Sequence, residues 1–303
     1  MTSILASVSG QSLLVALVGA LGLGSVYALV ALSFTLVYSA TGYIHVGMGA
    51  FVTVGAVGAY VGTVSLGWSW PVTGVVVAVV GAVLGVVSEI ISVRPIRGRA
   101  SDDHSAVIVS TLAFMIVVSS VISLWFGTDE LRVPAYIVGE PFRFGDVPVR
   151  RVFVVMTLAL ALVATTLELI IRRTETGRVL RASQDDPVGV ELMGVSFRRV
   201  VLVTFGLAGL LGALAGLLIS PVSYASPFVG ADLLIFGFAA MAIGGFGSFA
   251  GAIAGALLIG TVTSFSPLFL RTQFTKPLIL LLVLVILFAR PTGLLGRSQL
   301  RAV

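Results

Sequence analysis

The chain is dominated by long apolar runs, and this property constrains its fold more than any other. A helix that crosses a bilayer needs about 20 mostly apolar residues. The runs of this kind, including two shorter glycine-rich ones, are residues 12–38, 44–66, 70–93, 105–127, 152–171, 200–220, 231–247, 249–266 and 277–289. Because 58% of the residues are hydrophobic and the mean hydropathy is +1.14, a soluble domain is excluded. The sequence predicts an all-α, polytopic transmembrane helical bundle with about 8–9 crossings.

The two glycine-rich runs between 231 and 266 are interrupted by Gly244, Gly245 and Gly247. They fit either two thin crossing helices or one broken, re-entrant hairpin buried among the other helices. Short glycine-rich segments occur in both halves of the chain, at 42–62 and 237–260. Paired interrupted segments are typical of an inverted repeat with the transport pathway between its halves. Ordinary packing of small residues between helices explains each segment equally well.

The positions of arginine and lysine predict which way the bundle faces, because short cytoplasmic loops carry an excess of these residues. When the loop 172–199 is placed in the cytoplasm, twelve basic residues lie on that side: Arg94, Arg97, Arg99, Arg172, Arg173, Arg178, Arg181, Arg198, Arg199, Arg290, Arg297 and Arg301. Six then lie outside: Arg132, Arg143, Arg150, Arg151, Arg271 and Lys276. This arrangement predicts an external N-terminus, a cytoplasmic C-terminus and an irregular external loop at 128–151.

No residue pattern in the sequence points to catalysis or to a bound metal. There is no cysteine, and His45 and His104 are isolated from other ligand residues. A Walker loop for ATP is missing. The span acids Glu89 and Glu168 fall near span ends, whereas an ion relay needs ionisable groups deep in the membrane. We therefore expect no enzyme activity, no cofactor, no metal ion and no ion-coupled transport.

The sequence pI of about 10.1 raises the question of a nucleic-acid partner. The basic residues lie at the ends of apolar runs, where they anchor topology and meet anionic headgroups. We therefore expect contact with membrane lipid and not with nucleic acid.

The most polar part of the chain is the loop 172–199, between two predicted spans. Ten charged residues lie in it: Arg172, Arg173, Glu175, Arg178, Arg181, Asp185, Asp186, Glu191, Arg198 and Arg199. Asp186 followed by Pro187 favours a helix start, since an N-cap carboxylate accepts from free N–H groups and proline needs no partner there. The apolar stripe and the glycine that would end this helix are Val188, Leu192, Met193 and Gly194.

These features predict a short cytoplasmic helix at about 187–193. Arg178 and Arg181 precede it, one helical turn apart on the same face. A loop that only enforces topology has no need of a capped amphipathic helix. We therefore favour the interpretation that the loop docks on a partner.

Five stretches of the sequence carry a resemblance to a known family. They are G-S-V-Y-A-L-V-A-L-S-F-T-L-V-Y (Gly24–Tyr38), R-P-I-R-G-R (Arg94–Arg99), G-R-V-L-R-A-S-Q-D-D-P-V-G-V-E-L-M-G-V-S-F-R-R-V (Gly177–Val200), A-I-G-G-F-G-S-F-A-G-A-I-A-G-A-L-L-I-G (Ala242–Gly260) and A-R-P-T-G-L-L-G (Ala289–Gly296). In this order they resemble the permease subunits of branched-chain amino-acid (LIV-type) ABC importers. This family also includes urea and short-amide importer permeases. The resemblance covers nearly the whole chain.

The resemblance implies a single permease domain over residues 1–303, in a bacterial inner membrane. It implies a homologous second permease subunit, separate ABC ATPase subunits and an extracytoplasmic solute-binding protein as partners. The helix at 187–193 would be the coupling helix, which docks on an ATPase. Arg178 and Arg181 would support this docking, or would instead bind phospholipid headgroups. The glycines at 244, 245 and 247 would allow a tight turn and close helix approach.

The sequence departs from the family pattern after Gly42 and Ile44. Such permeases usually continue Asn-Phe-Ala-His-Gly, often with an acid next. Here His45 takes the asparagine position, Met48 takes the histidine position and Ala50 follows Gly49. If this segment lines the pathway together with Gly244, Gly245 and Gly247, the solute preference differs from the common members.

The solute and the permease pairing, with itself or with a different chain, stay open. Branched-chain or other amino acids, urea and short amides all fit the resemblance. The alternative function is a stand-alone channel or facilitator for a small neutral solute such as urea.

Overall fold

The computed structural model describes residues 10–97, 104–137, 141–144, 147–185 and 197–296. Within this part, eight helical stretches are long and apolar enough to cross a membrane. They are α2 (Gly10–Thr41), α3 with η1 (Met48–Tyr60, Val61–Ser65), α4 with η2 and α5 (Trp70–Ser88, Glu89–Val93, Arg94–Arg97), α6 (His104–Phe126), α7 (Arg151–Arg173), α10 (Phe197–Ser223), α12 (Phe249–Phe269) and η3 with α13 (Thr272–Phe274, Thr275–Ala289). The predicted polytopic helical bundle is confirmed.

A ninth apolar helix, α11 (Val229–Gly244), has only 16 residues. At 1.5 Å per residue it is about 24 Å long, short of the roughly 30 Å hydrocarbon core. A tight turn joins it to α12, where the Ser248 side chain accepts from the Gly251 N–H and starts the helix. The region 231–266 is therefore one short helix followed by one of full crossing length, packed together.

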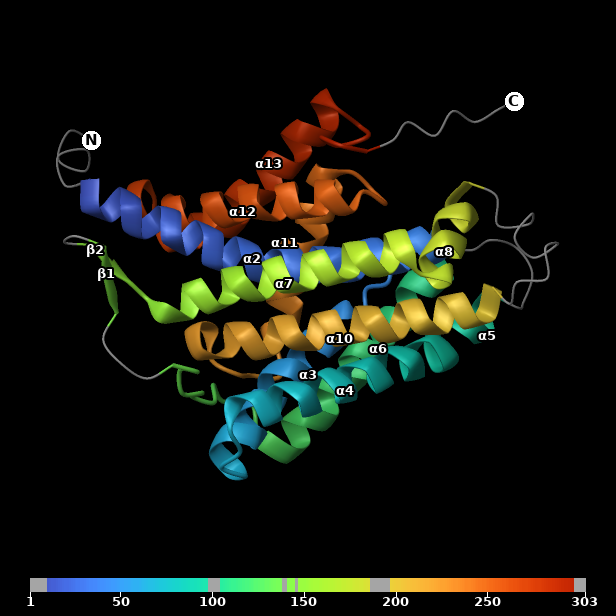
Figure 1. Cartoon of the computed structure of the whole chain (residues 1–303), viewed down its shortest axis with the longest axis horizontal. Helices are drawn as coiled ribbons and strands as arrows, with labels where there is room; N and C mark the ends of the chain where they lie inside the picture. The colour runs from blue at the N-terminus through green and yellow to red at the C-terminus, as the bar shows by residue number, and fades with distance from the viewer. Residues whose placement is uncertain (1–9, 98–103, 138–140, 145–146, 186–196, 297–303) are drawn as a thin grey trace.

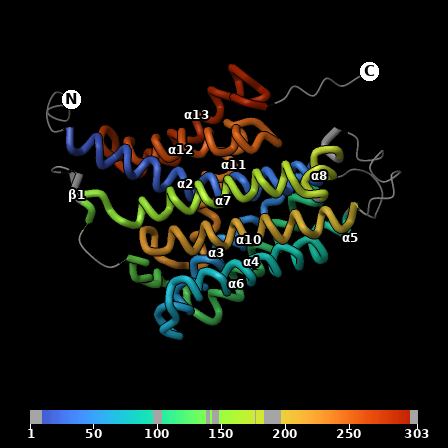
Figure 2. The backbone as a smooth tube through the Cα atoms, viewed as in Figure 1, coloured from blue at the N-terminus to red at the C-terminus, as the bar shows by residue number. Residues whose placement is uncertain are grey.

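The long helix α2 runs through the middle of the bundle, with α7, α10, α11 and α12 against it (Figure 1 and Figure 2). Its second half is almost completely buried. The helices α6, α7 and α13 lie at the periphery and bury only a small share of their residues, as lipid-facing helices do.

The two ends of the bundle carry different elements (Figure 1). One end, which we call the β end, has the start of α2 and a small antiparallel ribbon of β1 (Phe142–Phe144) and β2 (Val147–Val149). The opposite end, the α8 end, has α5 and α8 (Glu175–Asp185). The loop 128–151 thus contains a short ribbon where the sequence predicted only irregular structure.

Candidate functional site

Helix α8 turns back against the bundle directly after α7. Thr174 begins it, because its hydroxyl accepts from the Gly177 N–H at 3.1 Å. Gly177 and Leu180 are buried on the inner side of α8. A Cβ on Gly177 would lie 2.2 Å from the Ile171 carbonyl oxygen, so only glycine permits this approach to α7. The sequence did not predict this helix, although it indicated that Arg178 and Arg181 share one helical face.

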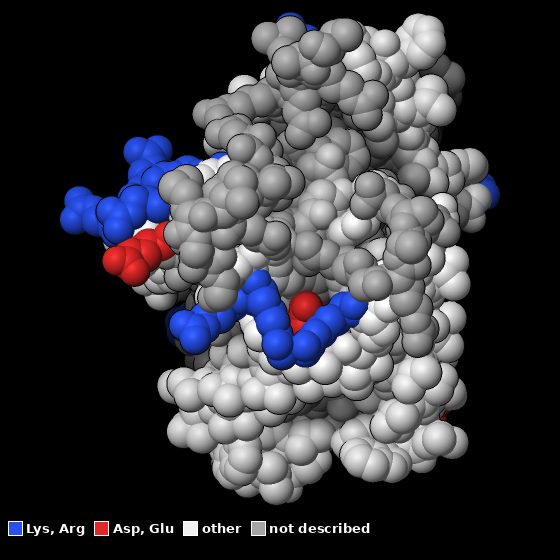
Figure 3. Space-filling view, turned by 90° about the vertical axis from the view of Figure 1, so that its right-hand side faces the viewer, with Lys and Arg blue, Asp and Glu red and all other residues white. Residues whose placement is uncertain are grey.

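The outer side of α8 and its surroundings is basic. Arg178 and Arg181 are exposed. The Arg178 guanidinium forms a long ion pair with the Glu175 carboxylate, with 3.9 Å between the two atoms. Other exposed arginines of this end are Arg94, Arg172, Arg173, Arg198 and Arg199. Figure 3 shows arginines gathered on this face with few acids among them. The other predicted coupling residues lie outside the described residues: Asp186, Pro187, Val188, Leu192, Met193 and Gly194.

The starts of α3 and α11 meet inside the bundle. Gly49 and Gly230, each the second residue of its helix, are in backbone contact, and a Cβ on Gly230 would lie 1.9 Å from the Gly49 carbonyl oxygen. The Thr53 hydroxyl accepts from the Gly230 N–H at 3.2 Å and donates to the Pro227 carbonyl oxygen at 3.4 Å. The sequence predicted Gly49 as a pathway residue but not its contact with Gly230.

His45 lies in the link between α2 and α3 and is 1% exposed. Its Nε2 is 2.7 Å from the Ser88 Oγ, and its ring stacks on Phe51 and meets the edge of Phe205. Met48 is fully buried at the start of α3. His45 is therefore a buried side chain, hydrogen-bonded to α4 and enclosed by two aromatic rings. A pathway role for His45 and Met48 stays a prediction.

Two glycines at the turn between α11 and α12, Gly244 and Gly245, lie against the backbone of other segments. Gly244 approaches Gly251, and Gly245, with φ of 105°, approaches Gly296. The segment 290–296 is held there by two bonds, from the Leu294 N–H to the Ile243 carbonyl and from the Leu295 N–H to the Gly244 carbonyl. Gly247 also has a positive φ, of 78°. Their role in turn and packing fits this geometry, and their pathway role stays a prediction.

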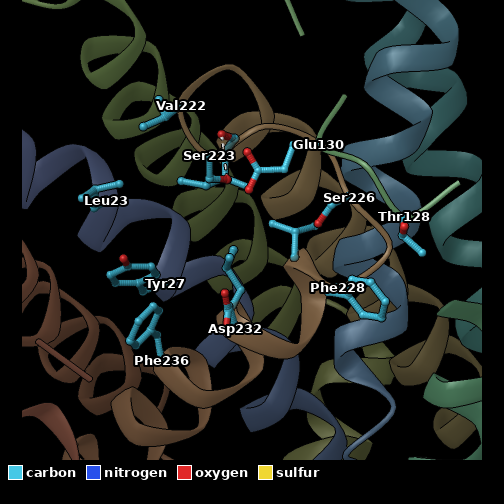
Figure 4. A pocket seen from close by; sticks show the side chains of 13 residues that line it. Leu23, Tyr27, Thr128, Glu130, Val222, Ser223, Ser226, Phe228, Asp232 and Phe236 are labelled. Carbon is cyan, nitrogen blue, oxygen red and sulfur yellow. Dashed lines mark hydrogen bonds between the residues drawn. The ribbon is translucent and has the colours of Figure 1, made fainter. Parts of the chain in front are cut away.

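A cavity of about 360 Å³ lies at the β end, between α2, α10, α11 and the segment after α6 (Figure 4). We call it the β-end cavity. Its lining combines apolar and aromatic side chains with two acids and several hydroxyls: Leu23, Tyr27, Ile219, Val222, Phe228, Val229, Leu233, Phe236, Glu130, Asp232, Thr128, Ser223 and Ser226.

This cavity was not predicted from the sequence. Asp232, an acid inside the predicted apolar run 231–247, was the signal that could have indicated it. Among the residues described in the structure, no group of three or more histidines and acids could hold a metal ion.

Residues 16–288 match the family model described as the branched-chain amino acid transport system permease component. The chain is 27% identical to the high-affinity branched-chain amino acid transport system permease protein LivH of Escherichia coli, over 93% of this chain and 94% of that protein. It is 28% identical to BraD of Pseudomonas aeruginosa, a permease protein of the same description, over 95% and 97%. A probable LivH of Methanocaldococcus jannaschii is 26% identical, over 92% and 91%.

The family match spans nearly all of the helical bundle, from the first half of α2 to the end of α13. The relatives align over almost their full lengths, so the match is not confined to one segment. This chain belongs to the family of branched-chain amino acid transport permeases and is a multi-pass inner-membrane permease subunit of an ABC importer.

Proposed function

We propose that this permease carries an amino acid, with branched-chain amino acids as the first candidates. The observation that carries the proposal is the near full-length match to permeases named for branched-chain amino acid transport. The departure at His45 and Met48 keeps other amino acids, urea and short amides as solutes to be tested. Residues 1–303 would form a single permease domain, which pairs with a second homologous permease.

The α8 end would face the cytoplasm and the β end the outside. Exposed arginines support this orientation, since they gather around α5 and α8. The N-terminus would then be external and the C-terminus cytoplasmic. Two ABC ATPase subunits would bind at the α8 end, and an extracytoplasmic solute-binding protein would deliver the solute at the β end.

The coupling surface would consist of α8 and the segment 186–194 that follows it. Gly177 lies against α7 and Leu180 is buried, so α8 is packed on the bundle. A displacement of α8 by a bound ATPase would therefore also displace the helices against which it packs. Phospholipid headgroups are the competing partner for Arg178 and Arg181.

The pathway would pass the junction of α3 and α11. Both helices follow a long helix and an irregular link, and both start inside the bundle. This repetition supports the interpretation of two halves related as an inverted repeat. The pathway residues proposed from the sequence are His45, Met48, Gly49, Gly244, Gly245 and Gly247.

The coupling surface is tested by Arg178→Glu and Leu192→Asp in the complex with its ATPases in proteoliposomes. We expect ATP hydrolysis to continue while solute uptake falls by about tenfold or more. Arg178→Glu reverses the charge that would face the ATPase, and Leu192→Asp places a carboxylate at an apolar docking position. Arg271→Glu, at the β end, is the matched control and should keep normal uptake. If solute uptake per ATP hydrolysed is unchanged in both Arg178→Glu and Leu192→Asp, the assignment of the coupling surface is ruled out.

The solute is tested by deleting the chain and measuring uptake of leucine, urea and acetamide by the cells. Loss of leucine uptake supports the proposal, and loss of urea or acetamide uptake alone overturns it. Flux through the purified chain without ATPase or ATP would instead favour the stand-alone facilitator.

A further inference from the structure

The β-end cavity has the size and the polarity of a small-ligand site. Its volume of about 360 Å³ falls within the usual range of roughly 300–1,000 Å³. Part of its wall is formed by buried side chains, including the rings of Tyr27 and Phe236, whose centroids are 5.0 Å apart. An aliphatic group packed against these rings would lose part of its contact with water.

The mouth of the cavity is acidic. Glu130 and Asp232 are exposed, and both line the cavity. Figure 4 shows Ser223 close to Glu130 and Asp232 farther along, with other lining side chains between the two acids. Lys276 of α13 pairs with Asp232, since its Nζ lies 2.6 Å from the Asp232 Oδ1. Among the described residues, Glu130 forms no ion pair, so one carboxylate at the mouth is available to an ammonium group.

The acidic mouth is held in place by the backbone. Leu131 and Ala225 exchange two hydrogen bonds of 2.7 and 2.9 Å, which join the segment after α6 to the link before α11. The Tyr136 hydroxyl donates to the Leu218 carbonyl of α10. Burial raises the pKa of Tyr136, so the donor keeps its proton at physiological pH. Tyr224 adopts a left-handed φ of 60° at this link, a conformation that a bulky residue takes only when its surroundings impose it.

We propose that the β-end cavity binds the solute directly, with the solute ammonium group at Asp232 and Glu130 and its aliphatic side chain against Tyr27, Phe236 and Leu233. The ligand class is an aliphatic α-amino acid. This proposal deepens the proposed function and rests on it for the direction of transport. In it, Lys276 competes with the solute for Asp232, so the ion pair opens when the ammonium group arrives.

The experiment measures displacement of radiolabelled leucine from the full chain, assembled with its partner subunits in nanodiscs. The probes are 3-methylbutylamine, which has the ammonium group but no carboxylate, and 4-methylpentanoate, which has the carboxylate alone. We expect leucine and the amine to displace the label and 4-methylpentanoate to fail. Displacement by 4-methylpentanoate but not by the amine would overturn the proposal.

Two variants test the acids. Because both side chains are partly in water, Asp232→Asn and Glu130→Gln should each weaken leucine binding by about threefold to tenfold. The matched control is Asp129→Asn, which makes the same charge change next to Glu130 but does not line the cavity. Equal affinities in all three variants would overturn the proposal.

Lys276→Gln separates a ligand role of Asp232 from a purely structural ion pair. If Asp232 binds the solute, removing its competitor should tighten binding by about twofold to threefold, whereas Asp232→Asn weakens it. If the pair is only structural, the two variants should have the same effect. A complex that still imports leucine with an unchanged KM in Asp232→Asn would refute this site and leave the proposed function standing, whereas absence of import of any amino acid would refute the function.

Discussion

Two links in this molecule, 42–47 and 224–228, share a backbone plan but differ in their surroundings. Each follows a long helix, α2 or α10, and leads into a short one, α3 or α11. Each begins with a left-handed residue, Gly42 at φ 72° and Tyr224 at φ 60°. In each, the third residue of the short helix donates at 3.0 Å to the residue before that helix.

The link 42–47 is closely packed and is held by hydrogen bonds to neighbouring helices. His45 is buried between Phe51 and Phe205 and bonded to Ser88, and the Val46 N–H donates to the Thr111 hydroxyl at 3.1 Å. The link 224–228 instead borders the β-end cavity, to which it contributes Ser226 and Phe228. The same backbone pattern is therefore closely packed around His45 at one link and borders a cavity with acids, hydroxyls and aromatic rings at the other.

The short helices that follow the two links meet directly. Gly49 of α3 and Gly230 of α11 are in backbone contact, so the starts of both helices are packed against each other.

The largest effect is expected where the two short helices meet. Gly230→Val places a side chain against the Gly49 carbonyl and the Thr53 hydroxyl, and it should destabilise the bundle by more than about 3 kcal/mol. The measurement is the midpoint of thermal unfolding in detergent. Gly74→Val is the matched control, because a Cβ on Gly74 has no neighbour within 4 Å. Similar midpoints for the two variants would show that the junction is not tightly packed.

A smaller effect should separate the closely packed link 42–47 from the link 224–228. His45→Ala removes the ring between two phenylalanines and leaves the Ser88 hydroxyl without this partner. We expect a loss of about 2–4 kcal/mol. Ser226→Ala at the link 224–228 should change stability by no more than about 0.5 kcal/mol. Equal losses in thermal midpoint would contradict the contrast between the links.

The smallest effect concerns the left-handed residue of each link. Gly42→Ala should destabilise the protein by about 1–2 kcal/mol, because a Cβ is strained in this conformation. Tyr224→Gly relieves the same strain, and it should stabilise the protein by up to about 1 kcal/mol. Opposite shifts of the thermal midpoint would confirm that both links need this conformation, and shifts of the same sign would speak against it.

The sequence predicted the spans well, because a membrane helix is specified by its local composition. The run 70–93, for example, coincides with α4 and η2. The alternatives at 231–266 could not be separated from the sequence, because the length of α11 depends on where the link before it ends. The helix α8 was missed, since its start depends on the Thr174 cap and on the fit of Gly177 against α7.

By itself, the amino-acid sequence determined that the protein lies in a membrane, the number of its spans to within one, its family and the presence of a basic face for partners. These properties follow from apolar length, charge distribution and local motifs. Only the tertiary structure decided that Gly49 meets Gly230 and that Glu130 and Asp232 share one cavity. The physical reason is that each of these contacts joins segments far apart in the chain, and only the packing of α2, α3, α10 and α11 brings them together.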